Sequence, residues 1–386
     1  MRVLLAFDKF KDSLDARTAG DTTAAVLRSR HPDWSLDLCP LSDGGEGFAE
    51  ILTAAAGGSL STVSITGPRN APLDAAFGLV PWSKIPPAAR AQLSLPANLP
   101  ADAEIAVIEM AAASGLALLP PDQRDPWQTT TLGTGQLIAA ATQAGAAAIL
   151  LGVGGSATHD LGLGALSALG LAFLSPNGES IRPPIPARWD TIECISGNIR
   201  ASVPPIRIAC DVTNPLLGRR GAAAVYGPQK GLKSEDFIKL DHASARLGLL
   251  LCAHSAQSDA LMDQPGAGAA GGIAFGLLAA AQAKLLPGFD LVAAWLDLEA
   301  RIATADLVIT GEGRFDDSSL SGKGPGAVVA RALALGKPVQ VFAGQVIGTH
   351  ARPGLTLHSI TPAGQTLAEA LPAAAANLAA AVTRAL

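Results

Sequence analysis

Residues 147–163 read AAILLGVGGSATHDLGL, an apolar run that passes into a glycine-rich turn. The apolar residues predict a strand over Ala148–Val153, and the turn after it places Ser, Thr, His and Asp side chains at positions 156–160. A strand that ends in a glycine-rich turn before a helix is where α/β proteins bind anions, because backbone N–H groups at the helix start point at the ligand. This stretch therefore predicts an α/β fold with a binding site at the end of the strand.

Both ends of the chain repeat this order of strand, turn and helix. Arg2–Phe7 predicts a buried strand, and Ser13 predicts the cap of a helix that continues to about His31. Further strands are expected over residues 37–41 near the N-terminus and 307–310, 339–343 and 357–361 near the C-terminus. The two ends thus predict one α/β domain with a parallel sheet.

The middle of the chain follows a different pattern. Residues 62–66 and 75–82 predict strands joined by a turn, and the proline-rich residues 83–103 predict an exposed loop or insertion. We therefore predict two domains: residues 1–66 and 280–386 form a discontinuous domain, and residues 67–279 form an inserted mixed α/β domain.

Composition excludes several classes of protein. The 386 residues are 49% hydrophobic and 16% charged with a formal net charge of -5, so a folded globular protein is expected and binding to nucleic acid is not. The four cysteines have no CxxC spacing, which argues against a disulfide framework or a zinc site and favours the cytoplasm. We predict no membrane span, and the sequence gives no indication of the oligomeric state.

Three common nucleotide and hydrolase motifs fail on inspection. Residues 152–157 match GxGxxA after a strand, but the acid at the expected distance, Glu179, lies in a turn and not at a strand end. The GKG at 322–324 lacks the rest of a P-loop, and Ser156 lies in GGSAT instead of GxSxG. The sequence therefore disfavours a nicotinamide dehydrogenase, a P-loop enzyme and a serine hydrolase.

Several polar loops instead share one chemical character, since they combine Lys, Arg and Asp with bare glycine N–H groups next to predicted strand ends. Phosphoryl transfer needs that combination, because its catalysis is mostly positioning and neutralisation of charge by cations. The loops are DKFKDS (8–13), SDGGEG (42–47), GVGGSATHD (152–160), DVTNP (211–215), GPQKG (227–231), TGEGRFD (310–316) and SGKGP (321–325).

Individual residues in these loops allow more than one interpretation. Asp43 and Glu46 are candidates for holding Mg²⁺ or for capping the next helix, and Glu109 for binding ligand or capping a turn. Asp211 directly follows an apolar strand, which favours a functional carboxylate. His159 has no second metal ligand nearby in the sequence, so we expect a structural role.

The ordered motifs SDGGEG, EMAAASGL, TTTLGTGQLI, GVGGSATHD, ACDVTNPLLG, YGPQKG, PGAGAAGG, TGEGRFD and GKGP resemble those of the bacterial type 1 glycerate kinase family, the glycerate 2-kinases. The resemblance implies a kinase that uses ATP and Mg²⁺ to phosphorylate D-glycerate, and a flavodoxin-like domain interrupted by a second α/β domain. Its motifs carry the site candidates Lys11, Ser13, Asp43, Gly154, Gly155, Ser156, Asp160, Asp211, Asn214, Lys230, Arg314, Asp316 and Lys323. The chain departs from the family at Lys9, His159 and Leu161, where serine, asparagine and glycine are usual.

We assign expected roles to these candidates. Asp211 orients or deprotonates the substrate hydroxyl, whereas Lys11, Lys323 and Arg314 neutralise the substrate carboxylate and the migrating phosphoryl group. Asp43 or Asp316 holds Mg²⁺. The expected product is 2-phosphoglycerate, and the alternatives are 3-phosphoglycerate, another small hydroxy acid as acceptor, or a non-catalytic protein that binds sugar acids.

Overall fold

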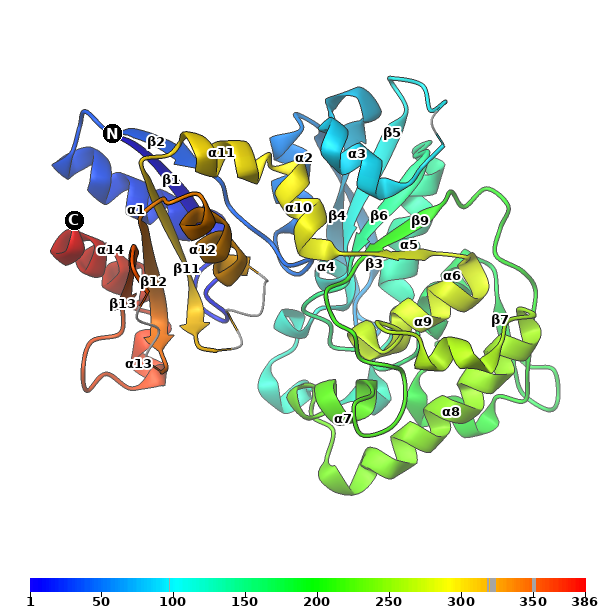
Figure 1. Cartoon of the computed structure of the whole chain (residues 1–386). Coiled ribbons are helices and arrows are strands. Elements are labelled where there is room, and N and C mark those ends of the chain that lie inside the picture. Colours follow the sequence, from blue (N-terminus) through cyan, green and yellow to red (C-terminus); the bar gives the residue numbers. More distant parts are fainter. Residues whose placement is uncertain (97, 318, 320–323, 349–351) are drawn as a thin grey trace. The chain divides into compact units, whose positions relative to one another are not determined.

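The computed structural model describes residues 1–96, 98–317, 319, 324–348 and 352–386. Its contacts divide the chain into two compact units, each α/β (Figure 1). Unit 1 consists of Met1–Asp43 and Phe289–Leu386, and unit 2 is the continuous segment Gly44–Gly288.

Unit 1 is built on a five-stranded parallel sheet with the order β13-β12-β11-β1-β2. Numbered along the chain within this unit, the order is 2-1-3-4-5, that of one of the two common doubly wound sheets. The direction of the order reverses between β1 and β11, where Phe7 pairs with Gly311, and ligands bind beyond the carboxyl ends of strands at such a point. The strands are β1 (Arg2–Phe7), β2 (Ser35–Leu38), β11 (Leu307–Phe315), β12 (Val339–Val346) and β13 (Leu355–Ser359).

Helices bury both faces of β1, which explains its unbroken apolar sequence. Val3, Leu5 and Phe7 share one hydrophobic cluster with residues of α1 and α14. Leu4 on the alternate side of the strand is equally buried. The helices of unit 1 are α1 (Ala16–Arg30), α10 (Gly288–Trp295), α11 (Leu298–Thr304), α12 (Gly324–Ala334), α13 (Leu367–Ala370) and α14 (Ala374–Ala385).

Unit 2 contains a six-stranded mixed sheet with the order β10-β9-β6-β5-β4-β3. The strands β10, β9, β6 and β5 are parallel, so their carboxyl ends meet at one edge, whereas β4 runs antiparallel to β5 and β3. The strands are β3 (Ser59–Thr66), β4 (Pro72–Pro81), β5 (Glu104–Glu109), β6 (Ala148–Gly152), β9 (Ile206–Ala209) and β10 (Lys284–Leu286); β7 (Ala172–Leu174) and β8 (Cys194–Ser196) form a separate hairpin.

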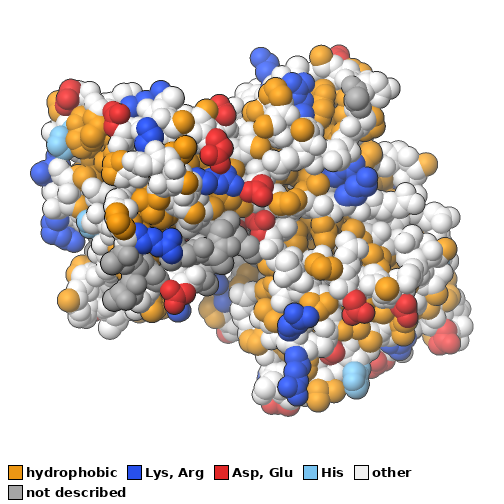
Figure 2. Space-filling view, viewed as in Figure 1, with side chains coloured by type: hydrophobic (Ala, Val, Ile, Leu, Met, Phe, Trp, Pro, Cys, Tyr) orange, Lys and Arg blue, Asp and Glu red, His pale blue; other side chains and the backbone are white. Residues whose placement is uncertain are grey.

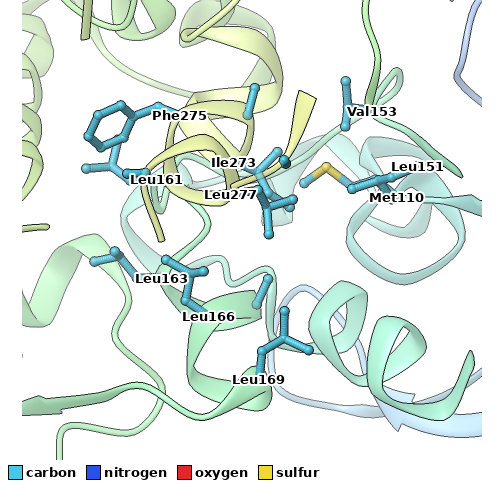
Figure 3. Packing of buried hydrophobic residues seen from close by; sticks show 14 of the residues in the cluster. Met110, Leu151, Val153, Leu161, Leu163, Leu166, Leu169, Ile273, Phe275 and Leu277 are labelled. Atoms are coloured by element: carbon cyan, nitrogen blue, oxygen red, sulfur yellow. The ribbon is translucent and has the colours of Figure 1, made fainter. Parts of the chain in front are cut away.

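The helices of unit 2 pack on this sheet around a large apolar core. Figure 3 shows Ile273 and Leu277 of α9 gathered with Leu161, which precedes α6, and Met110, which follows β5. The helices are α2 (Phe48–Ala55), α3 (Pro87–Leu93), α4 (Ala111–Ser114), α5 (Leu132–Gln143), α6 (Leu163–Leu169), α7 (Ala222–Tyr226), α8 (Phe237–His254) and α9 (Ala269–Ala281).

The structure differs from the sequence-based expectations at three points. The α1 helix is capped by Asp15, which accepts a hydrogen bond from the Thr18 N–H, and not by Ser13. Residues 83–103 are not simply an exposed loop, since α3 buries Ala89 and Leu93. The compact units divide after Asp43, whereas the sequence suggested a domain boundary after residue 66, and β3 pairs with β4 in the sheet of unit 2.

Candidate functional site

A group of charged side chains lies at the carboxyl ends of β1 and β11, where the strand order of unit 1 reverses. Asp8 follows β1, is only 8% exposed, and accepts a hydrogen bond from the Lys9 N–H at 2.7 Å. The Asp8 N–H in turn donates to the Gly311 carbonyl at 3.0 Å, which places Asp8 beside Glu312 on β11. Two carboxyl groups therefore lie close together at the position where an open α/β sheet binds ligands.

Burial and mutual repulsion keep these two carboxyl groups from ionising readily. Burial raises the pKa of Asp8 to about 8, the negative charges of Asp43 and Glu312 add to that rise, and Lys9 opposes it. Burial also raises the pKa of Glu312 to about 7, with smaller contributions from Asp316 and Asp43. The Oε1 atom of Glu312 is buried without a hydrogen-bond partner in the described part of unit 1. The arrangement therefore favours a proton or a cation beside these oxygens.

Two ion pairs accompany the carboxyl groups at the same edge of the sheet. The Lys9 ammonium lies 3.4 Å from an Asp43 carboxylate oxygen, and the Arg314 guanidinium lies 2.8 Å from Asp316. Lys11 is exposed, and its backbone nitrogen would lie 3.2 Å from a β-carbon added at Gly313. The structure thus brings four of the predicted residues, Lys11, Asp43, Arg314 and Asp316, to one edge of unit 1.

Ser13 and Lys323 are two further residues that the sequence predicts for the site. The Ser13 hydroxyl donates to the Phe10 carbonyl at 3.0 Å, so it closes its own turn. Lys323 lies outside the described residues, although Gly324 at the start of α12 is described. A β-carbon added at Gly324 would lie 3.2 Å from the Asp8 carboxylate, so the start of α12 adjoins the acidic group.

In unit 2, two glycine-rich loops pack backbone against backbone. The Gly154 N–H donates to the Gly44 carbonyl at 2.9 Å. A β-carbon at Gly154 would lie 2.7 Å from the Gly45 backbone, and one at Gly152 would lie 2.5 Å from the Gly44 carbonyl. The missing side chains therefore allow the loop that begins at Gly44 to reach the carboxyl end of β6.

Acidic side chains lie around these loops. A β-carbon at Gly155 would lie 2.5 Å from the Glu46 carboxylate, and one at Gly288 would lie 3.0 Å from the Asp211 carboxylate. The Glu109 carboxylate accepts the Ala49 N–H at 3.1 Å in the first turn of α2, and so contacts a distant helix as well as lying at the end of its own strand. Asp211 lies two residues after the end of β9 and is partly exposed, so its carboxylate stands at the carboxyl edge of the sheet.

The remaining predicted residues of unit 2 lie mostly inside the protein. Asp160 is buried and accepts hydrogen bonds from the Thr131 N–H and hydroxyl and from the N–H groups of Gly162 and Gly164. Asn214 donates to the Arg220 carbonyl and accepts from the Tyr226 hydroxyl. These contacts give both side chains a role in holding the loops in shape.

Ser156 and Lys230 contact each other directly. The Lys230 ammonium donates to the Ser156 hydroxyl at 2.8 Å and to the Thr158 carbonyl at 2.6 Å, and the lysine is 1% exposed. His159 is buried and its Nε2 bonds the Ser244 hydroxyl at 3.0 Å, in agreement with the structural role expected for it. Burial lowers the pKa of His159 to about 3, which leaves the ring neutral near pH 7.

Sequence reasoning left Asp8 and Glu312 out of the candidate set. Asp8 is the first residue after a strand whose last five residues are buried, the same signal that pointed to Asp211. Glu312 lies within β11, where a strand pattern alone gives no reason to single it out. Among the residues that the structure describes, no group of three or more His, Cys, Asp or Glu side chains is placed to hold a metal ion.

On the face drawn in Figure 2, the visible Lys and Arg side chains are interspersed with Asp and Glu, which agrees with the small net charge of -5. No helix in the described ranges is long and apolar enough to cross a membrane.

Comparison with known proteins gives a consistent set of relatives. The model of the glycerate kinase family matches residues 3–386. The chain is 39% identical to a Bacillus subtilis glycerate kinase over 348 residues (90% of this chain, 85% of the relative), and 36% identical to an Escherichia coli glycerate 2-kinase over 352 residues (90% and 86%).

A solved structure from Salmonella typhimurium LT2, described as a candidate glycerate kinase 2, is also similar. It is 37% identical, with a TM-score of 0.72 and coverage of 100% of this chain and 97% of that chain. The family model spans nearly all residues, and these relatives align over nine-tenths of the chain. The chain belongs to the glycerate kinase family.

Proposed function

We propose that this chain phosphorylates D-glycerate at the 2-hydroxyl with ATP and produces 2-phosphoglycerate. Family membership supports the reaction, and the E. coli relative is named for phosphorylation at position 2. The observation that carries the proposal is the group of Asp8, Glu312 and neighbouring cations at the carboxyl ends of β1 and β11. Phosphoryl transfer relies on charge neutralisation and positioning of this kind.

The proposed roles follow the chemistry of each group. Asp211 orients the attacking hydroxyl and accepts its proton, since it is a partly exposed carboxylate at the end of β9. Lys11 and Arg314 supply positive charge to the substrate carboxylate and the migrating phosphoryl group, and we keep Lys323 in this role from the sequence alone. Asp160 and Asn214 act through the loops that they hold.

We also propose Mg²⁺ as the metal of the reaction. The partnerless Oε1 atom of Glu312 fits a cation beside these two carboxyl groups, and so do the burial and the neighbouring negative charges that raise the pKa of Asp8. Mg²⁺ commonly takes one or two protein carboxylates and completes its shell with water and substrate phosphates. Asp8 and Glu312 would hold it, whereas Asp43 is paired with Lys9 and Asp316 with Arg314; when bound, the ion would neutralise phosphate charge.

The domain assignment remains part of the proposal. We infer that unit 1 is a flavodoxin-like domain and that unit 2 is an α/β domain inserted into it, with boundaries after Asp43 and Gly288 in place of 66 and 279. A cytoplasmic location fits four cysteines that the structure leaves as free thiols.

A coupled assay tests the proposed reaction. ADP release with D-glycerate is measured together with the phosphoenolpyruvate that added enolase forms, because enolase consumes 2-phosphoglycerate directly. We expect both signals without phosphoglycerate mutase. A phosphoenolpyruvate signal that needs the mutase would assign the product as 3-phosphoglycerate and overturn the proposed position.

The role of Asp211 has its own test. Asp211→Asn removes the proton acceptor, so kcat is expected to fall by about 100-fold or more while the circular dichroism spectrum is unchanged. Asp190→Asn is the matched control, since Asp190 is an exposed aspartate of the same unit. Full activity of Asp211→Asn would exclude this carboxylate as the base.

A further inference from the structure

Lys230 is a buried lysine to which the proposed reaction assigns no role. It ends the short 3₁₀ helix η6 (Pro228–Lys230), and the left-handed Gly231 that follows packs against the Arg124 backbone. Its side chain is 1% exposed, and its ammonium reaches the Ser156 hydroxyl and the Thr158 carbonyl. A lysine enclosed in this way is uncommon, because burial penalises its charge.

The surroundings of Lys230 compensate its charge only in part. None of the ion pairs within the described ranges includes Lys230. Burial lowers the pKa of Lys230 to about 7, and the more distant Asp160 carboxylate opposes that fall. Of the other titratable groups nearby, His159 is neutral near pH 7, and Glu46 lies against Gly155 in the same turn as Ser156. Lys230 can therefore gain or lose its proton near neutral pH.

The protonation state of Lys230 decides what Ser156 can offer to a ligand. A charged ammonium has only donors, so the Ser156 oxygen must accept from it and the serine proton must be donated elsewhere. A neutral amine keeps its donation to the Thr158 carbonyl and gains a lone pair that accepts the serine proton. Ser156 then faces outward as an acceptor, which repels anionic oxygens.

We propose that Lys230 is a positioning residue that makes Ser156 a hydrogen-bond donor to an anionic oxygen of the substrates. The inference rests on the proposed function, because glycerate and ATP are both anionic. Ser156 is 7% exposed and lies in the turn that follows β6, at the carboxyl edge of the sheet. Lys230 itself remains behind Ser156 and does not touch the ligand.

This arrangement predicts a particular dependence on pH. Only the charged form of Lys230 fixes Ser156 as a donor, so the KM of the anion that Ser156 binds should rise as pH increases above about 7. For a single titrating group the rise approaches about tenfold per pH unit. The dependence should appear in KM more than in kcat, since Lys230 acts on binding.

Four variants separate this role from simple packing. KM for D-glycerate and for ATP, and kcat, are measured from pH 6 to 9. Ser156→Ala should raise one KM about tenfold to 100-fold at pH 6, the cost of one lost hydrogen bond to a charged group, and remove its rise with pH. Lys230→Met should also remove the rise with pH but raise KM less, because Ser156 keeps its proton and loses only its fixed orientation, whereas Ser156→Thr should keep the wild-type profile. Lys233→Met, an exposed lysine close in sequence, should change neither value.

A second measurement keeps the inference testable if Lys230→Met does not fold. The side-chain nitrogen of Lys230 is followed by NMR in wild type and in Ser156→Ala, with and without ATP. We expect anion binding to raise the pKa of Lys230 in wild type and to leave it unchanged in Ser156→Ala. Retention of the wild-type pH profile of KM by Ser156→Ala, or an equal pKa response in both proteins, would overturn the inference. Absence of ADP release with D-glycerate in wild type would overturn the proposed function alone.

Discussion

Burial raises the pKa of Asp8 to about 8 and that of Glu312 to about 7, so the folded protein disfavours the ionised form of both carboxyl groups. A group with a raised pKa binds more protons in the folded state than in the unfolded chain. Its contribution to stability is therefore fully present at acidic pH and is lost as pH rises through the folded pKa. Between about pH 4 and pH 8, ionisation of Asp8 works against folding, as expected for a residue kept for function.

Asp8→Asn tests this directly. The amide removes the charge, so at pH 8 the variant should be more stable than wild type by about 1–3 kcal/mol, although we expect it to lose kinase activity. The gain should shrink toward zero by pH 4, where the wild-type carboxyl is protonated. Urea unfolding at a series of pH values measures it, with the exposed Asp33→Asn as control. A stability difference that does not change with pH would contradict the assigned cause.

At the scale of elements, the sequence is informative about strands and their following loops but not about which loops meet. β1 coincides with the expected Arg2–Phe7, and the strand before GVGGSATHD ends within one residue of the expected position. The partner of Ser156 lies 74 positions away at Lys230, and Gly154 bonds Gly44. Such contacts depend on strand order in the sheet, which local periodicity does not encode.

Gly154→Ala tests the contact between the two glycine loops. The added methyl group would lie 2.7 Å from the Gly45 backbone, so the loop that begins at Gly44 must move. We expect a loss of about 1–3 kcal/mol in stability, as for other overpacked sites. Displacement of groups near the carboxyl edge should lower kcat/KM by about 100-fold.

Gly20→Ala is the control for this substitution, because an added β-carbon there meets nothing within 4 Å. Gly20 lies inside α1, so alanine should stabilise that helix by about 0.5–1 kcal/mol and leave kinetics unchanged. Wild-type kcat/KM in Gly154→Ala would show that the loop contact does not position the site.

Arg207 explains why residues 83–103 are not a detached insertion. Its guanidinium is buried and donates to the Leu93 carbonyl at 2.7 Å and the Ser94 carbonyl at 2.9 Å, which ties the end of α3 to β9. The proline content of the segment favoured a loop. The hydrogen bonds that anchor α3 join residues 113 or 114 positions apart, and local sequence patterns do not reveal such contacts.

Arg207→Met should therefore loosen α3. Each buried carbonyl left without its donor costs about 1–3 kcal/mol, and amide hydrogen exchange should rise across residues 87–94 more than in α5. The exposed Arg219→Met is the control. Unchanged exchange over α3 would contradict the anchoring role.

At the scale of the whole molecule, the chain passes between the two units at only two peptide bonds, Asp43–Gly44 and Gly288–Phe289. All six strands of the mixed sheet come from the continuous unit 2. Unit 1 is different, because β1 lies between β2 and β11 and so joins parts from both ends of the chain. Unit 2 therefore has what an independent domain needs, whereas unit 1 requires both of its segments.

The excised fragment 44–288 should consequently fold on its own, with a cooperative thermal transition and the circular dichroism of an α/β protein. Fragment 67–279, cut at the boundaries that the sequence suggested, lacks α2, β3 and β10. It leaves β4 without the partner that pairs along Pro72–Leu79, and such an open edge favours aggregation. We expect light scattering and no cooperative transition from it. Equal thermal stability of the two fragments would show that residues 44–66 are not part of the folding unit. It would also mean that β3 pairs with β4 only after the other strands have assembled and does not stabilise them.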